Sequence, residues 1–177
     1  DPELLWYKAR LLIAENKTAS SLLAENILVD VTEDNPRFSF GWSLLSELYL
    51  NQDENGKAMD KILEGLKYCP NDKALLLLKA KIEILSSPEI AVTTLEHLNK
   101  CIPNDIDIIL LLSDTYMLIN QHQKGIQLLK EYELKCPNLQ RQKVGSALAI
   151  ALFRSGNIDE AWHKLENLPM LNKNSID

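Results

Sequence analysis

Apolar residues recur along this chain at spacings of three and four residues. Leu45, Leu48 and Tyr49 form one such set, and the same spacing returns around Tyr132. This spacing places the side chains on one face of an α-helix, whereas a half-buried strand would alternate residue by residue. The pattern therefore predicts an all-α chain of amphipathic helices.

Short breaks rich in Asn, Ser, Gly and Pro separate the apolar stretches, as expected where helices end and turns begin. With these breaks as boundaries, the chain is predicted to form ten helices. We expect them over residues 3–15, 18–32, 37–51, 54–68, 71–86, 88–101, 104–119, 122–135, 139–155 and 158–168.

The prolines divide these helices into pairs. Pro2, Pro36, Pro70, Pro103 and Pro137 are separated by 34, 34, 33 and 34 residues, and Pro169 follows after 32. Asn and Asp follow several of these prolines, and their side chains can accept hydrogen bonds from the first free amides of a new helix. The spacing predicts a repeat of about 34 residues that contains two helices.

The repeats resemble the tetratricopeptide repeat family, whose motif sets large and small apolar residues at fixed positions of helix A and helix B before a proline. The second repeat supplies Trp42, Leu45, Ser46, Tyr49, Ala58, Ile62 and Pro70, and the fourth supplies Ile109, Leu112, Ser113, Tyr116, Gly125, Leu129 and Pro137. The third repeat departs from the motif, with Lys79 where Leu is usual and Glu83 where Tyr is usual. In the first repeat, Leu4–Arg10 pairs with Leu75–Lys81 of the third.

This resemblance implies a right-handed α-solenoid of about five helix-turn-helix repeats. We expect a single array over 1–177 that is a segment of a longer protein, with repeats at 3–36, 37–70, 71–103, 104–137 and 138–169. The small residues Ala58, Ala91, Gly125 and Ala161 are predicted to lie where helices approach closely.

Charge and length limit the choice of partners. The 177 residues carry 25 acidic and 19 basic side chains, a net charge of −6, which argues against a nucleic-acid surface. Apolar runs such as Ala147–Phe153 are too short to cross a bilayer, so no membrane insertion is expected. Any targeting segment is expected outside this sequence. The compartment stays open, although free thiols slightly favour the cytoplasm.

Residues that could carry chemistry are few and scattered. Cys69, Cys101 and Cys136 precede successive prolines, and we expect them to pack at the ends of B helices. His97 and Cys101 are four residues apart on one predicted helix, but two ligands make a weak metal site. No phosphate-binding loop or nucleophile elbow occurs. We therefore expect no enzyme activity, no cofactor and no metal.

The resemblance implies that helix A residues line a concave groove. Applied to this sequence, it gives Trp6, Arg10, Phe40, Ser43, Glu47, Leu50, Leu77, Lys81, Ile84, Leu110, Asp114 and Met117. The charges of Arg10, Glu47, Lys81 and Asp114 alternate in sign. Either these side chains pair with one another and keep the groove hydrated, or they contact a peptide or a partner helix. Trp6 and Arg10 stand where a carboxylate-binding clamp has Lys and Asn on the first helix A, and Leu77 and Lys81 stand at the positions on the third.

Three functions fit this picture. The first is a non-catalytic scaffold that binds a protein or peptide in the groove. The second is the recognition or regulatory region of a larger enzyme, such as a glycosyltransferase. The third is a structural module that self-associates through its terminal repeats.

Overall fold

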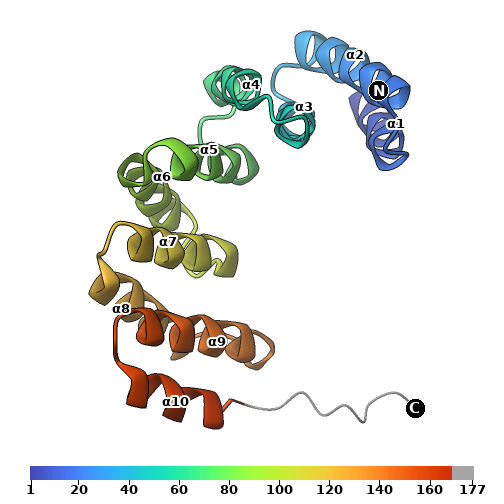
Figure 1. Cartoon of the computed structure of the whole chain (residues 1–177). Helices are drawn as coiled ribbons and strands as arrows, with labels where there is room; N and C mark the ends of the chain where they lie inside the picture. The colour runs from blue at the N-terminus through green and yellow to red at the C-terminus, as the bar shows by residue number, and fades with distance from the viewer. Residues whose placement is uncertain (169–177) are drawn as a thin grey trace, which may run out of the picture. The chain divides into compact units, whose positions relative to one another are not determined.

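The computed structural model describes residues 1–168, and this part of the chain contains ten α-helices and no strand (Figure 1). The helices are α1 (Pro2–Ala14), α2 (Thr18–Asp34), α3 (Ser39–Asn51), α4 (Asn55–Tyr68), α5 (Lys73–Ser86), α6 (Pro88–Cys101), α7 (Ile106–Leu118), α8 (His122–Glu133), α9 (Asn138–Arg154) and α10 (Ile158–Glu166). The predicted all-α, helix-turn-helix architecture is confirmed, and every helix begins and ends within two residues of its predicted range.

The two-residue differences at α5 and α7 have a physical cause. Asp72 Oδ1 accepts a hydrogen bond from the Leu75 amide at 3.0 Å, and Asp105 Oδ1 accepts from the Asp107 and Ile108 amides at 3.1 and 3.3 Å. Each aspartate is therefore the N-cap, and the helix begins at the residue after it. After Pro70 and Pro103, the aspartate thus caps the helix instead of forming part of its first turn.

Helices pack in sequence order inside two compact units, Asp1–Thr94 and Leu95–Asp177. In the first unit, α1 pairs with α2 and α3 with α4, while α1 contacts α3 and α3 contacts α5. In the second unit, α7 pairs with α8 and α9 with α10, while α7 contacts α9. Each unit therefore has a row of A helices in mutual contact, with the B helices packed against them.

Four of the turns between helix A and helix B contain a residue in the left-handed backbone region. These residues are Asn16, Asp53, Asn120 and Gly156, with φ between 52° and 84°. After three of them, an amide bonds back to a carbonyl five residues earlier, as from Glu54 to Tyr49 at 2.9 Å. This is the Schellman arrangement that ends a helix, and Asn, Asp and Gly tolerate the required φ.

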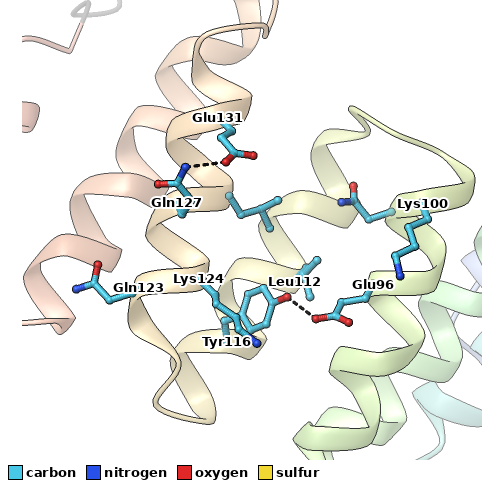
Figure 2. Close-up of a pocket in the computed structure, with 10 residues that line it drawn as sticks. Glu96, Lys100, Leu112, Tyr116, Gln123, Lys124, Gln127 and Glu131 are labelled. Atoms are coloured by element: carbon cyan, nitrogen blue, oxygen red, sulfur yellow. Dashed lines mark hydrogen bonds between the residues drawn. The ribbon is translucent and has the colours of Figure 1, made fainter.

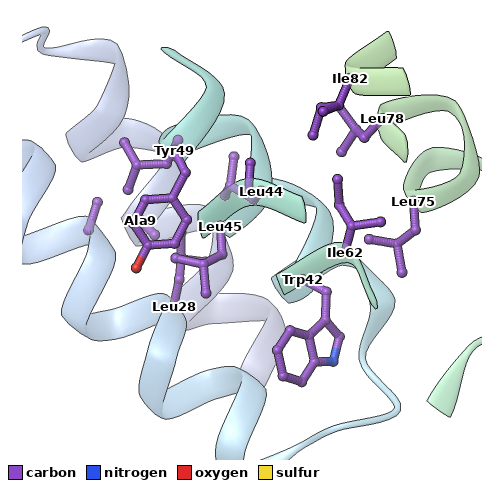
Figure 3. Close-up of a cluster of buried hydrophobic side chains, with 13 residues drawn as sticks. Ala9, Leu28, Trp42, Leu44, Leu45, Tyr49, Ile62, Leu75, Leu78 and Ile82 are labelled. Atoms are coloured by element: carbon purple, nitrogen blue, oxygen red, sulfur yellow. The ribbon is translucent and has the colours of Figure 1, made fainter. Parts of the chain in front are cut away.

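A buried apolar cluster holds the first unit together (Figure 3). Ala9, Leu28, Leu45, Ile62 and Leu75 come from five successive helices and are fully buried. In the second unit, the corresponding cluster joins Ile109, Met117, Ile126, Leu129, Tyr132, Val144, Leu148, Leu152 and Ala161. The core of each unit is thus shared between neighbouring hairpins.

Small residues lie where two helices meet most closely. Ala58, Ala91, Gly125 and Ala161 are all buried, as predicted. Gly65 of α4 faces Trp42, so a Cβ atom at Gly65 would lie 2.8 Å from the Cβ and Cγ of that tryptophan. Trp42 is held in place because its Nε1–H donates to the Pro36 carbonyl at 2.8 Å.

The third repeat fills its motif positions with a buried ion pair. Lys79 Nζ lies 2.9 Å from Glu83 Oε1, and the Thr94 hydroxyl donates to Glu83 Oε2 at 2.7 Å. Glu83 and Thr94 are buried, while a quarter of the Lys79 side chain is exposed. Three polar groups that satisfy one another thus replace the leucine and tyrosine of the motif.

The two glycines of α4 give a matched test of close packing. We expect Gly65→Ala to lower the free energy of unfolding by about 1 to 3 kcal/mol, because its Cβ would overlap Trp42. Gly56→Ala has no atom within 4 Å of its new Cβ and should be neutral or stabilising by up to about 1 kcal/mol. Urea unfolding of both variants measures the difference. Equal stabilisation of the two variants would contradict the close contact.

The ion pair of the third repeat predicts a non-additive pair of mutations. Lys79→Met should lower the free energy of unfolding by about 2 to 4 kcal/mol, because it leaves the buried Glu83 carboxylate without its cation. Restoring the motif with Lys79→Leu and Glu83→Tyr together should return stability to within about 1 kcal/mol of wild type or above it. Chemical denaturation at pH 7 provides the measurement. A double variant no more stable than Lys79→Met would refute the pairing.

Candidate functional site

The charged residues of the predicted groove are exposed and form no ion pair with one another. Arg10, Glu47 and Lys81 lie on α1, α3 and α5 of the first unit, and Asp114 lies on α7 of the second. Within residues 1–168, none of the four lies within 4 Å of an opposite charge. The alternation in sign therefore does not arise from ion pairs between neighbouring A helices.

Arg10 has an aromatic neighbour instead. Its guanidinium carbon lies 5.2 Å from the centre of the Trp6 ring, a cation–π arrangement that orients both side chains. The Trp6 Nε1–H donates to the Phe40 carbonyl at 3.0 Å, which ties α1 to the start of α3. The structure thus brings together three of the predicted groove residues.

Further aromatic rings surround this contact. The centres of Trp6 and Tyr7 are 4.8 Å apart, and those of Trp6 and Phe40 are 5.9 Å apart. Phe38 lies 5.7 Å from Phe40, and a cavity of about 200 Å³ is lined by these four aromatic residues and Glu3. Sequence reasoning missed Tyr7 and Phe38. The available signal was the presence of four aromatics in two short segments of a chain with only 6% aromatic residues.

Two groove assignments are corrected by the structure. Ser43 and Met117 are buried, with 8% and 6% of their surface exposed. The Ser43 hydroxyl donates to the Phe40 carbonyl at 3.1 Å. Met117 packs against α8, where its Cε lies 2.5 Å from the position of a Cβ on Gly125. Both residues are thus enclosed within their own units and do not line an open surface.

The other apolar groove residues are partly buried. Leu50, Leu77 and Ile84 in the first unit, and Leu110 in the second, retain some exposure. Asp114 lies one turn after Leu110. Although its side chain is exposed, the neighbouring protein removes part of the water from its carboxyl and raises the pKa of that group, while the positive charge of Arg154 acts in the opposite direction. In each unit, partly exposed apolar side chains therefore lie on the same helices as exposed charges.

A second kind of surface feature lies beside the B helices. In the second unit, the Tyr116 hydroxyl of α7 donates to Glu96 Oε1 of α6 at 2.6 Å, and Lys124 of α8 lies 5.6 Å from the Tyr116 ring centre (Figure 2). These residues line an open pocket of about 560 Å³ together with Leu112 and Gln127. The pocket combines one apolar wall with hydrogen-bonding side chains.

The first unit contains an equivalent arrangement. The Tyr49 hydroxyl donates to Glu25 Oε1 at 2.8 Å, and Lys57 lies 5.5 Å from the Tyr49 ring centre, beside a pocket of about 450 Å³. Burial and the neighbouring Glu25 carboxylate raise the pKa of Tyr49 to about 12. Sequence reasoning assigned Tyr49 and Tyr116 to the motif only. Tyr49 and Tyr116 are 67 residues apart, as are Lys57 and Lys124, and this shared spacing was the available signal.

The residues considered for metal binding or redox chemistry lie apart. His97 Nε2 is 3.8 Å from Cys101 Sγ, but in the part of the chain that the structure describes, no third His, Cys, Asp or Glu joins them in a group that could hold a metal. Cys136 is buried as expected and Cys69 is partly buried. Cys101 is exposed, so the packing prediction is wrong there. The expectation of no metal, cofactor or catalytic residue stays a prediction.

Among residues 1–168, no helix combines the length and the apolar character that a bilayer crossing requires.

Comparison with known proteins gives matches of structure only. No family model and no curated protein sequence matches the chain. MamA 41-end from Desulfovibrio magneticus RS-1 is similar with a TM-score of 0.75 and 16% identity, over 94% of this chain and 92% of that one. The nearly identical TPR-like repeats of a putative kinesin light chain from Podosopora anserina are similar with a TM-score of 0.72 and 17% identity. The match covers 94% of this chain and 93% of that one.

A third solved structure is YrrB, described as a TPR protein with an unusual peptide-binding site. It gives a TM-score of 0.67 and 12% identity, over 89% of this chain and 79% of that one. Identities this low establish a common fold and leave function to be argued separately. With its paired helices, small residues at close contacts and A helices in mutual contact, the chain has the fold of the tetratricopeptide repeat proteins.

Proposed function

We propose that this chain is a non-catalytic scaffold that binds a protein or peptide on the exposed face of its A helices. The observation that carries the proposal is the set of exposed charges on that face, which make no ion pair within residues 1–168. Charges that form no ion pair in the fold are available to pair with a ligand. The description of YrrB as a peptide-binding TPR protein is consistent with this proposal.

The first unit offers the better-formed surface. Trp6 and Phe40 are held together by a hydrogen bond and a ring contact, so their exposed parts require little ordering when a ligand binds. Tryptophan and arginine are the residues that most often dominate binding energy at protein interfaces, and here Arg10 lies over Trp6. Trp6 and Phe40 would contact an apolar side chain of the ligand, and Arg10 would pair with a nearby carboxylate.

Glu47 on α3 and Lys81 on α5 would pair with charged groups of the same ligand. Their opposite signs favour a partner that presents a basic group near Glu47 and an acidic group near Lys81. Because both side chains are exposed, they contribute more to specificity and association rate than to total affinity. The partner is expected to be a protein segment, since the net charge of −6 disfavours nucleic acid.

A charge exchange on the A helices tests the proposal. We expect Glu47→Lys with Lys81→Glu to lower retention of the partner about tenfold, because the total charge is kept while the pattern that the partner meets is reversed. The measurement is quantitative affinity capture from a lysate of the source cells, with the variant and the wild-type chain compared by mass spectrometry.

The control is the same exchange on the B helices of the same unit, Asp30→Lys with Lys67→Glu. Both residues are exposed and lie on α2 and α4. This control should retain the partner as wild type does. If both exchanges retain it equally well, the charges of the A helices do not recognise the ligand and the proposal fails.

A further inference from the structure

Four of the chain's eleven aromatic residues surround one small cavity in the first unit. Trp6 and Tyr7 lie on α1, Phe38 directly precedes α3, and Phe40 lies in the first turn of α3. Their side chains and that of Glu3 line the cavity. The cavity therefore lies between α1 and the elements that follow it in the chain, and the packing of α1 on α3 forms its walls.

The rings that form these walls meet at steep angles. The plane of Trp6 is inclined by 76° to that of Tyr7 and by 62° to that of Phe40, and Phe38 is inclined by 56° to Phe40. Packing of this kind prevents two ring faces from covering each other, as they do in a parallel stack. The face of an aromatic ring carries partial negative charge and attracts cations.

The polar groups around the cavity favour a cationic ligand. The Trp6 Nε1–H and the Phe40 carbonyl are bonded to each other. Glu3 is the one charged residue among the five that line the cavity, and within residues 1–168 its carboxylate forms no ion pair. The contact of Arg10 with Trp6 shows that this ring attracts positive charge, although Arg10 itself does not line the cavity. The cavity thus combines four rings with one negative charge.

The size of the cavity and its few hydrogen-bond acceptors narrow the choice of cation. Its volume of about 200 Å³ equals that of about seven water molecules in the liquid, which is enough for a trimethylammonium group and its methylene. A primary ammonium has three N–H donors that need acceptors, and the walls offer little besides the Glu3 carboxylate. A methylated ammonium keeps the charge and loses these donors.

We propose that this cavity is an aromatic cage that binds the methylated ammonium group of a lysine side chain in the protein partner. A choline headgroup carries a similar cation, but its phosphate would meet a lining with one carboxylate and no basic residue. The inference rests on the proposed function, because Trp6 and Phe40 belong to the face of the A helices that would contact the partner. It names the side chain that these two residues bind.

The indole N–H signals of the three tryptophans test the cage in proton–nitrogen correlation NMR spectra. The probes are the N-acetyl amides of trimethyllysine, of unmodified lysine and of a neutral analogue with carbon in place of the charged nitrogen. Among the tryptophans, only the signal that disappears in Trp6→Phe should shift. Trimethyllysine should bind at least about tenfold more tightly than either other probe, because it alone combines the charge with weak hydration.

Two variants and their matched controls test the lining. Glu3→Gln and Phe40→Leu should each weaken binding of the trimethyllysine probe about threefold to tenfold, because each removes a group that attracts the cation. Glu47→Gln and Phe153→Leu make the same changes at exposed residues outside the cavity and should bind the probe as wild type does. Circular dichroism confirms that each variant is folded.

Equal affinity for trimethyllysine and its neutral analogue would mean that the cavity recognises apolar shape alone, and the proposal would be wrong. It would also be overturned by the absence of a Trp6 shift, by unchanged binding in Glu3→Gln, or by tighter binding of phosphocholine than of trimethyllysine. The exchange of Glu47 and Lys81 tests the proposed function separately. If that exchange lowers partner capture while the cavity binds no probe, only the present inference fails.

Discussion

A two-helix hairpin cannot bury its own apolar stripe, and this constraint governs the rest of the structure. Fully buried residues such as Leu28, Leu45 and Leu75 come from different hairpins and meet in one cluster. Each A helix is therefore buried by its own B helix and by the neighbouring hairpins. Such contacts require helices to approach closely, which explains why glycine faces Trp42 at position 65 and Met117 at position 125.

Local features of the fold follow from the sequence because their causes are local. The helix period and the caps at Asp72 and Asp105 depend on residues within one turn of each other, and they give helix boundaries within two residues. The candidate site is less predictable. The burial of Ser43 and Met117 depends on how neighbouring side chains pack, and the bond from Tyr49 to Glu25 joins residues 24 positions apart.

Two sets of charged residues on the A helices have different roles. Glu83 and Lys79 satisfy each other with the help of Thr94, so their charges belong to the folded core. Arg10, Glu47, Lys81 and Asp114 have no such partner within residues 1–168 and do not contribute ion pairs to the fold. A sequence pattern alone does not separate these groups, because both place charges on an otherwise apolar helix. The structure separates them through distance and burial.

The dependence of each hairpin on its neighbours is measured most directly by amide hydrogen exchange, at a concentration where the chain is monomeric. Amides of α3, which contacts α1, α2, α4 and α5, should exchange more slowly than those of α1, and amides of α8 and α9 more slowly than those of α10. Equal protection of α1 and α3, and of α10 and α8, in the monomer would contradict the account, because it would mean that each hairpin is stable without the next.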